Sequence, residues 1–199
     1  MDGIESEPKV SDLKQIGLLL PSLIALQKLL ARFGDQGIII GGVAASLLGK
    51  PRLTADVGAM ILLSIENLPH LTNAAIEVGL VPRISNAEDF ASRHRVLLLR
   101  HQESGINVDI SLGILPFEVE AVERSVVCQV GNLAIRLPTP EDLIIFKAVA
   151  HRPQDLLDIQ AIVENKPGLD RERIKHWVQE FAQVLEMSEL WDDIAHWWF

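Results

Sequence analysis

The feature that most constrains the fold is a short apolar run, followed by two glycines and a second apolar run. Residues 37–40 read Gly-Ile-Ile-Ile, which is typical of a buried strand, and residues 43–48 have the composition of a short helix. Gly41-Gly42 lies between them and predicts a tight turn from strand into helix. This order of elements is typical of a domain that combines helices with a sheet.

The rest of the chain continues this alternation. Strands are predicted at residues 56–63, 95–100, 106–110, 126–130 and 133–137, and helices at residues 14–33, 66–78 and 116–123. Thr139 as N-cap and Pro140 at the first helical position predict a helix start. Four helices then follow, at residues 141–151, 153–164, 170–185 and 188–196. We therefore expect an α/β (α+β) fold that combines a sheet with helices and ends in a C-terminal helical region.

Length and composition limit the organisation and the partners of the chain. A chain of 199 residues can bury one substantial core, so we expect an α/β core at residues 1–138 and a helical region at 139–199 in one cooperative unit. A net charge of -9 argues against a surface that attracts nucleic acid everywhere, although a local basic site stays open. The single Cys128, with apolar neighbours that predict a buried thiol, fits a reducing cytoplasm. The sequence has no run of membrane-spanning length, so a cytoplasmic protein without membrane association is expected.

Two features indicate where chemistry takes place. The glycine turn lets backbone N–H groups approach an anion at a helix N-terminus. Asp56 and Asp109 both lie on predicted strands, and alternation along residues 106–110 turns Asp109 away from the apolar side. Either feature alone is commonly structural, as a tight turn or a solvated strand edge. Together they predict a phosphate site with carboxylates for a divalent metal.

The residues around these two features form an ordered set, namely Gly41, Gly42, Ala44, Gly49, Arg52, Thr54 and Asp56. This set resembles the signature GG-x-A…G-x-x-R-x-T-x-D-x-D of the nucleotidyltransferase superfamily, in particular its small bacterial toxin-type and minimal members. Residues 107–110 are similar to the strand with the third carboxylate of that superfamily. Residues 137–147 and 151–159 are similar to the two helices that follow, so the resemblance covers residues 38–162.

The resemblance implies a mixed sheet flanked by helices, a substrate, a metal and a role for each matching residue. It implies transfer of NMP from an NTP to an acceptor hydroxyl, with two Mg²⁺ or Mn²⁺ ions held by three carboxylates. Asp56 and Asp109 would be the catalytic metal ligands. The residues that would bind the nucleotide are Gly41, Gly42, Arg52, Thr54 and Lys147.

One position departs from the signature, because Gly58 stands where the second aspartate of D-x-D is expected. In the intact motif, alternate strand positions place both carboxylates on one face, where they share a pair of metals. With Gly58 only two carboxylates remain. Glu66, Glu88 or Asp89 could supply the missing carboxylate, but nothing in the sequence places any of them at the site. Transfer is therefore expected to be weak or absent.

Three functions stay open from the sequence. The first is an enzyme, and the second is a catalytically degenerate module that binds a nucleotide or a protein, such as a toxin–antitoxin partner. The third is an oligomerising domain that uses the Trp-rich tail at residues 191–199. A group of basic residues forms either a face for an RNA or protein acceptor or a solvated strand edge. These residues are Arg83, Arg93, His94, Arg95, Arg100 and His101. Lys147 either contacts the phosphate or base of the nucleotide or is a helical lysine whose side chain reaches solvent. Asp155 and Asp158 either pack the helix beneath the site or form local charge pairs near Arg152.

Overall fold

The fold is built on a five-stranded mixed sheet. The computed structural model describes residues 17–34 and 36–198. The strand order is β1-β2-β5-β4-β3, and the sheet is antiparallel except for the parallel pair β2 and β5. The strands are β1 (Gly37–Ile40), β2 (Asp56–Leu62), β3 (Leu80–Pro82), β4 (Val96–His101) and β5 (Asn107–Gly113).

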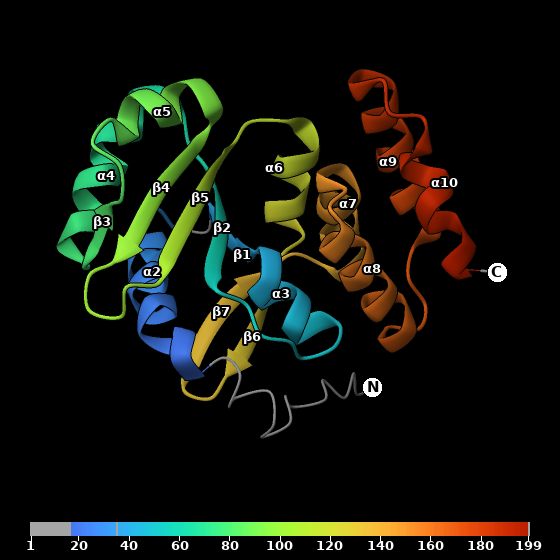
Figure 1. The fold of residues 1–199 in the computed structure, drawn as a ribbon, viewed down its shortest axis with the longest axis horizontal. Coiled ribbons are helices and arrows are strands. Elements are labelled where there is room, and N and C mark those ends of the chain that lie inside the picture. The colour runs from blue at the N-terminus through green and yellow to red at the C-terminus, as the bar shows by residue number, and fades with distance from the viewer. Residues whose placement is uncertain (1–16, 35, 199) are drawn as a thin grey trace.

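One face of this sheet is packed and the other is partly open. Val57, Ala59, Val108, Ile110 and Leu97 alternate onto the packed face and are fully buried. Helix α2 (Leu20–Ala31), which follows η1 (Gly17–Leu19), lies behind β4 and β5 in Figure 1 and covers this face. Helix α4 (Leu68–Glu77), which directly follows η2 (Ile65–Asn67), packs beside α2. The strand residues that alternate with these buried ones point to the other face of the sheet. At the centre of that face they are half-buried or exposed.

The open face is bounded by further helices. Helix α3 (Gly41–Leu48) starts where β1 ends, and α5 (Ala87–His94) connects β3 to β4. Helix α6 (Pro116–Glu123) closes the end of the face near β1, where its Val122 packs with Ile38 and Met60. The centre of the face, on β2 and β5, is left without a covering apolar layer.

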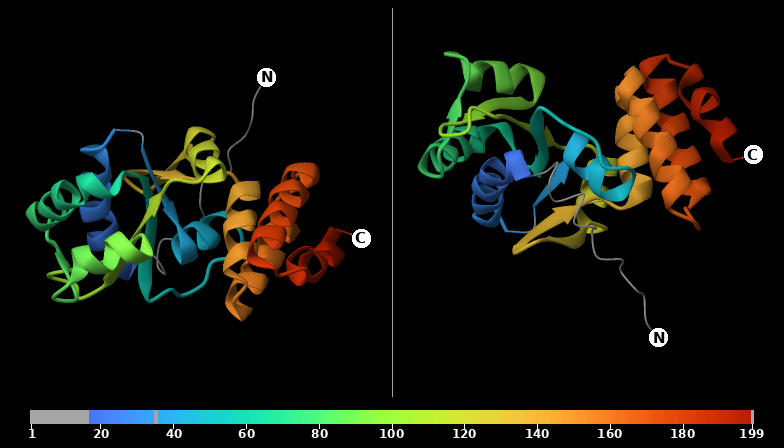
Figure 2. Two further views of the ribbon diagram at one scale, coloured as in Figure 1. Left: turned by 90° about the horizontal axis from the view of Figure 1, so that it is seen from above. Right: turned by 60° about the horizontal axis from the view of Figure 1, so that its bottom comes forward.

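The second half of the chain adds a hairpin and a helical bundle. The hairpin pairs β6 (Val126–Val130) with β7 (Leu133–Leu137). The bundle consists of α7 (Pro140–Ala150), α8 (Pro153–Asn165), α9 (Arg171–Leu185) and α10 (Glu189–Ala195), with η3 (His196–Trp198) after them. Figure 2 shows these helices, orange to red, side by side at one end of the sheet. One cluster of buried apolar side chains extends from Leu19 to Ile194 and joins both halves.

The expected α/β class with a mixed sheet and a C-terminal helical region is confirmed. Thr139 caps α7 as expected, since its hydroxyl accepts a hydrogen bond from the backbone N–H of Asp142 at 3.2 Å.

Several local details differ from the prediction. The short strand β3 and helix α5 were not predicted. Arg95 ends α5 in the left-handed conformation (φ 54°) instead of starting a strand. Cys128 is only half-buried because its neighbours on β6 are exposed. The part of the predicted first helix at residues 14–16 lies outside the described residues.

Candidate functional site

The two predicted carboxylates lie on the same, open face of the sheet. Gly58 is the direct partner of Asp109 across the parallel pair of β2 and β5, and Asp56 is the partner of Asn107 one row away. Since side chains alternate along a strand, Asp56, Asn107 and Asp109 point to this face, and position 58 lies on it without a side chain. Asp56 is exposed and Asp109 is half-buried. The negative charge of Asp56 also acts on the ionisation of Asp109, as expected of neighbours.

The glycine turn borders these carboxylates. Gly41 has a φ of +69°, a conformation that favours glycine, and a Cβ added to it would lie 3.9 Å from the Cα of Gly58. A Cβ on Gly42 would lie only 2.4 Å from the Oγ1 of Thr54, so this position is closed to larger residues. The Thr54 hydroxyl in turn donates to the carboxylate of Asp56 at 3.2 Å. Residues that are up to seventeen positions apart in the sequence, from Gly41 to Gly58, are therefore gathered beside the N-terminus of α3.

That N-terminus is open to an anion. No side chain caps α3 at Ile40, and Gly41 and Gly42 are half-exposed. The first N–H groups of a helix lack intrahelical partners and carry partial positive charge, which favours a phosphate or a carboxylate. The local geometry therefore offers an anion site next to Asp56.

Asp109 has a cationic partner that the sequence did not reveal. The Nη1 of Arg83 donates to Oδ1 of Asp109 at 2.6 Å, and Nη2 donates to Oδ2 at 3.3 Å. The exposed fractions of the two side chains are 20% and 35%. Burial raises the pKa of Asp109 above its ordinary value and the charge of Asp56 adds to this, although the hydrogen bond from Arg83 acts in the opposite direction.

Arg52 lies next to the glycine turn but is held by the helical bundle. Its Nε and Nη2 donate to the two carboxylate oxygens of Asp158 at 2.6 and 2.7 Å, which is a bidentate pair between the α3–β2 loop and α8. A Cβ on Gly42 would lie 3.3 Å from Nη2 of Arg52, so the guanidinium borders the turn. The pair fixes the loop that carries Thr54 into β2.

Lys147 lies beneath this pair and not at the surface. Its side chain is 4% exposed, and its ammonium donates to Asp155 at 3.0 Å and to Asp158 at 2.6 Å. Asp155 also binds Arg152 at 2.6 Å, as local pairing predicted. Burial opposes the ionisation of both aspartates, but these hydrogen bonds outweigh it and hold their pKa values below the ordinary range. The alternative that Lys147 reaches solvent is wrong, and its contact with phosphate or base stays a prediction.

The donor set does not fit a two-metal centre. The described part of the chain contains no group of three or more His, Cys, Asp or Glu side chains that could hold a metal ion. Asp56 and Asp109 are the two carboxylates on the paired strands β2 and β5. Both carboxylate oxygens of Asp109 accept hydrogen bonds from Arg83. Packing does not explain the glycine at position 58, because an added Cβ would meet Ile40 only at ordinary contact distances of 3.5–3.7 Å.

The other basic residues do not form one common face. Arg93 bonds to the backbone of its own helix, Arg95 bonds to the carbonyl oxygens of Leu63 and Leu112, and His101 is buried on the packed face. Arg83 and Arg100 share the open face with the carboxylates. The Nε of Arg100 donates to Oδ1 of its cross-strand partner Asn107 at 3.2 Å.

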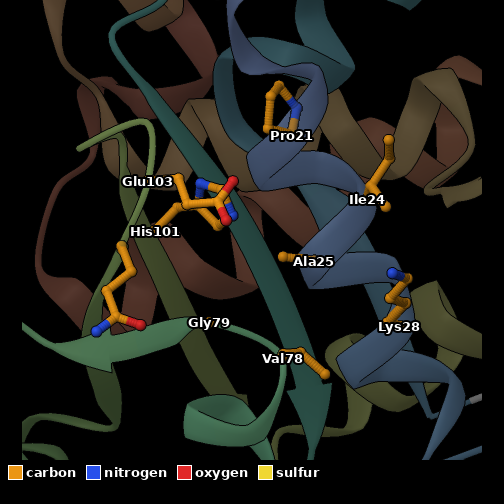
Figure 3. A pocket seen from close by; sticks show the side chains of 9 residues that line it. Pro21, Ile24, Ala25, Lys28, Val78, Gly79, His101 and Glu103 are labelled. Carbon is orange, nitrogen blue, oxygen red and sulfur yellow. The ribbon is translucent and has the colours of Figure 1, made fainter.

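A separate hollow of about 410 Å³ lies away from the carboxylates, on the packed side of the sheet. Figure 3 shows Lys28 and Ile24 of α2 on one side of it and His101 and Glu103 on the other. The Nδ1 of His101 is bonded to Ser104 at 2.9 Å, and Ser104 is bonded to Ser22 at 3.0 Å. None of the residues predicted to bind metal or nucleotide lines this hollow.

The Trp-rich tail packs on its own chain over residues 191–198. Trp191 and Trp198 stack with ring centroids 5.8 Å apart, and both pack against the core with Trp197. Its role in homo-oligomerisation stays a prediction. Among the described helices, none has the length and apolar composition needed to span a bilayer.

Comparison with known proteins gives structural neighbours only. No protein-family model matches the sequence, and no curated protein matches it. An antigenic nucleotidyltransferase-like protein from Paracoccidioides brasiliensis is similar in structure, with 16% identity, 94% of this chain and 93% of that chain covered, and a TM-score of 0.51. The antibiotic-resistance factor ANT(2'')-Ia in its solution structure is similar with 15% identity, coverage of 89% and 96%, and a TM-score of 0.56. This chain therefore has the fold of the nucleotidyltransferase-like proteins.

Proposed function

We propose that this protein binds a nucleoside triphosphate at the N-terminus of α3 and that its transfer of NMP to an acceptor hydroxyl is weak or absent. The observation that carries the proposal is Gly58, which faces Asp109 across paired strands next to Gly41. The place for the phosphates is thus retained beside an incomplete set of carboxylates. The similarity in fold to the nucleotidyltransferase-like protein from Paracoccidioides brasiliensis supports the choice of ligand class.

The binding part of the proposal assigns a role to each residue near the turn. The backbone N–H groups of Gly41 and Gly42 receive the triphosphate at the uncapped helix end. Thr54 orients Asp56 through its hydroxyl. Arg52 and Lys147 act as positioning residues, because both are bound to Asp158 and fix the loop beside the turn. A direct contact of Lys147 with phosphate would require its ammonium to leave two buried aspartates.

The chemical part of the proposal follows from charge. Nucleotidyl transfer requires the stabilisation of negative charge on the phosphate and the activation of the attacking hydroxyl, and two-metal centres supply both. Here Asp56 is the one site carboxylate whose oxygens are not bound by an arginine, so we derive no step through a metal pair. Binding without efficient transfer is the outcome that this set of side chains supports.

The test is a calorimetric titration with ATP, CTP, GTP and UTP in Mg²⁺, Mn²⁺ or chelator, combined with an assay for labelled NMP transfer. We expect saturable binding of at least one nucleotide, weakened in Gly42→Ala, and no transfer above background. Transfer by the native chain at an ordinary enzymatic rate, about 1 per second or faster, would contradict the proposal.

A gain-of-function variant sharpens the test. Gly58→Asp adds a carboxylate opposite Asp109, and its Cβ would meet Ile40 only at ordinary contact distances, so it is expected to create transfer that the further change Asp56→Ala abolishes. Asn107→Asp is the matched control, because it adds the same charge to the same face one row away. If all four nucleotides fail to bind, the binding part of the proposal is wrong, and a module that binds a protein or RNA partner, of the toxin–antitoxin type, becomes the hypothesis to test.

A further inference from the structure

We propose that the Arg83 guanidinium is the resident cation of this site, takes the place of a divalent ion at Asp109, and binds a phosphate group of the ligand directly. The part that concerns phosphate rests on the proposed function, whereas the part that concerns the cation does not. The disagreement between the carboxylate set and a metal centre is the starting observation. Where a metal ligand is expected, both oxygens of Asp109 already accept hydrogen bonds from Arg83.

The sheet itself places Arg83 at Asp109. The backbone N–H of Arg83 donates to the carbonyl oxygen of Leu98 at 3.1 Å, directly after the end of β3. Leu98 is in turn the cross-strand partner of Asp109. Gly58, Asp109, Leu98 and Arg83 therefore form one row across the open face, and the arginine reaches over the half-buried Leu98 to the carboxylate. The pairing follows from strand register and is not an accidental surface contact.

Partial burial reduces the screening of this ion pair by water. The Arg83 side chain is 20% exposed and that of Asp109 is 35% exposed, so water screens the pair less than it would screen an exposed one. A hydrogen-bonded pair with two parallel N–H···O contacts is among the stronger charge-assisted arrangements. A divalent ion at Asp109 would have to displace a guanidinium that the register of the sheet holds in place.

Arg83 retains capacity for a second anion. A guanidinium has five N–H groups in a fixed planar fork, and two of them are used on Asp109. The remaining groups match the geometry of phosphate oxygens, which arginine binds more specifically than a point charge does. Asp109 thus orients the guanidinium, and the guanidinium supplies the positive charge that a metal ion supplies elsewhere.

The experiment uses Mn²⁺ alone as the first probe, followed by electron paramagnetic resonance of the free ion, without nucleotide. The full chain is expected to bind Mn²⁺ weakly, and Arg83→Gln to bind it at least about tenfold more tightly, because a nearby positive charge no longer repels the ion. Arg83→Lys keeps the charge and is expected to behave as the native chain does. Arg100→Gln is the matched control, since it removes the same charge from the same face but leaves Asp109 paired.

The second probe is inorganic tripolyphosphate, titrated in the presence of chelator. Native protein is expected to bind it with the same affinity as in Mn²⁺, and Arg83→Gln is expected to lose at least about tenfold in affinity. Tight Mn²⁺ binding by the native chain that is lost in Asp109→Asn and unchanged in Arg83→Gln would overturn the proposal. Tripolyphosphate binding that requires Mn²⁺ would also overturn it. If the Mn²⁺ results are as expected and no nucleotide binds, the failure belongs to the proposed function alone.

Discussion

Replacing Lys147 with methionine is predicted to lower the free energy of unfolding by about 3 kcal/mol. Lys147 connects Asp155 and Asp158, and the exposed fractions of the three side chains are 4%, 3% and 5%. Removing one partner from a buried ion pair costs about 3–5 kcal/mol, because the remaining charge is left uncompensated. Each aspartate keeps an arginine here, Arg152 and Arg52, so we expect a value at the lower end of that range.

The assay is equilibrium unfolding in urea, followed by circular dichroism at pH 7. With a urea m-value of about 2–3 kcal/mol/M, the loss corresponds to a shift of about 1 M in the midpoint. Lys50→Met is the matched control, because Lys50 pairs with Glu164 at the surface and its removal changes the net charge equally. Its midpoint is expected to stay unchanged. Equal shifts for the two variants would refute the reasoning that burial makes the Lys147 network strong.

The same network gives a prediction about pH. Asp155 and Asp158 have pKa values below their ordinary value in the folded protein, so the unfolded chain binds protons more readily than the folded one does. Their contribution to stability is present above the ordinary aspartate pKa of about 4 and is lost as the pH falls through the lowered values. The difference between native protein and Lys147→Met should therefore be largest near pH 7 and narrow below about pH 4. A difference that is independent of pH would contradict the assignment.

Two further predictions concern the glycine turn and the start of the bundle. Gly42→Ala is expected to cost about 1–3 kcal/mol, because the new Cβ would lie 2.4 Å from Thr54, whereas Gly17→Ala meets nothing within 4 Å and should be neutral in thermal unfolding. Thr139→Ala removes the hydrogen bond to the N–H of Asp142 and is expected to cost about 1 kcal/mol, or about 3 °C in Tm. Thr139→Ser keeps the cap and should retain the native Tm, and a loss in that variant would show that the cap is not the cause.

Much of the fold followed from the order of residues in the chain. The β-branched run before Gly41 and the alternation along β5 both appear in the structure as predicted, as does the capped start of α7. The short strand β3 was missed because three residues that end in Pro82 carry no measurable period. Without β3, nothing placed Arg83 next to Asp109, and the arginine was read only as one of several basic residues.

The sequence by itself determined most of the strands and helices, and that Asp109 points away from the apolar side of its strand, because these properties depend on neighbours along the chain. That Asp56 and Asp109 share one face follows from the pairing of β2 with β5. Only the tertiary structure decided which charges meet. Arg83 reaches Asp109 from 26 positions away through two strand pairings, and Arg52 reaches Asp158 from 106 positions away through the docking of the bundle. Charge partners of this kind depend on strand order and helix packing, which no local pattern of residues encodes.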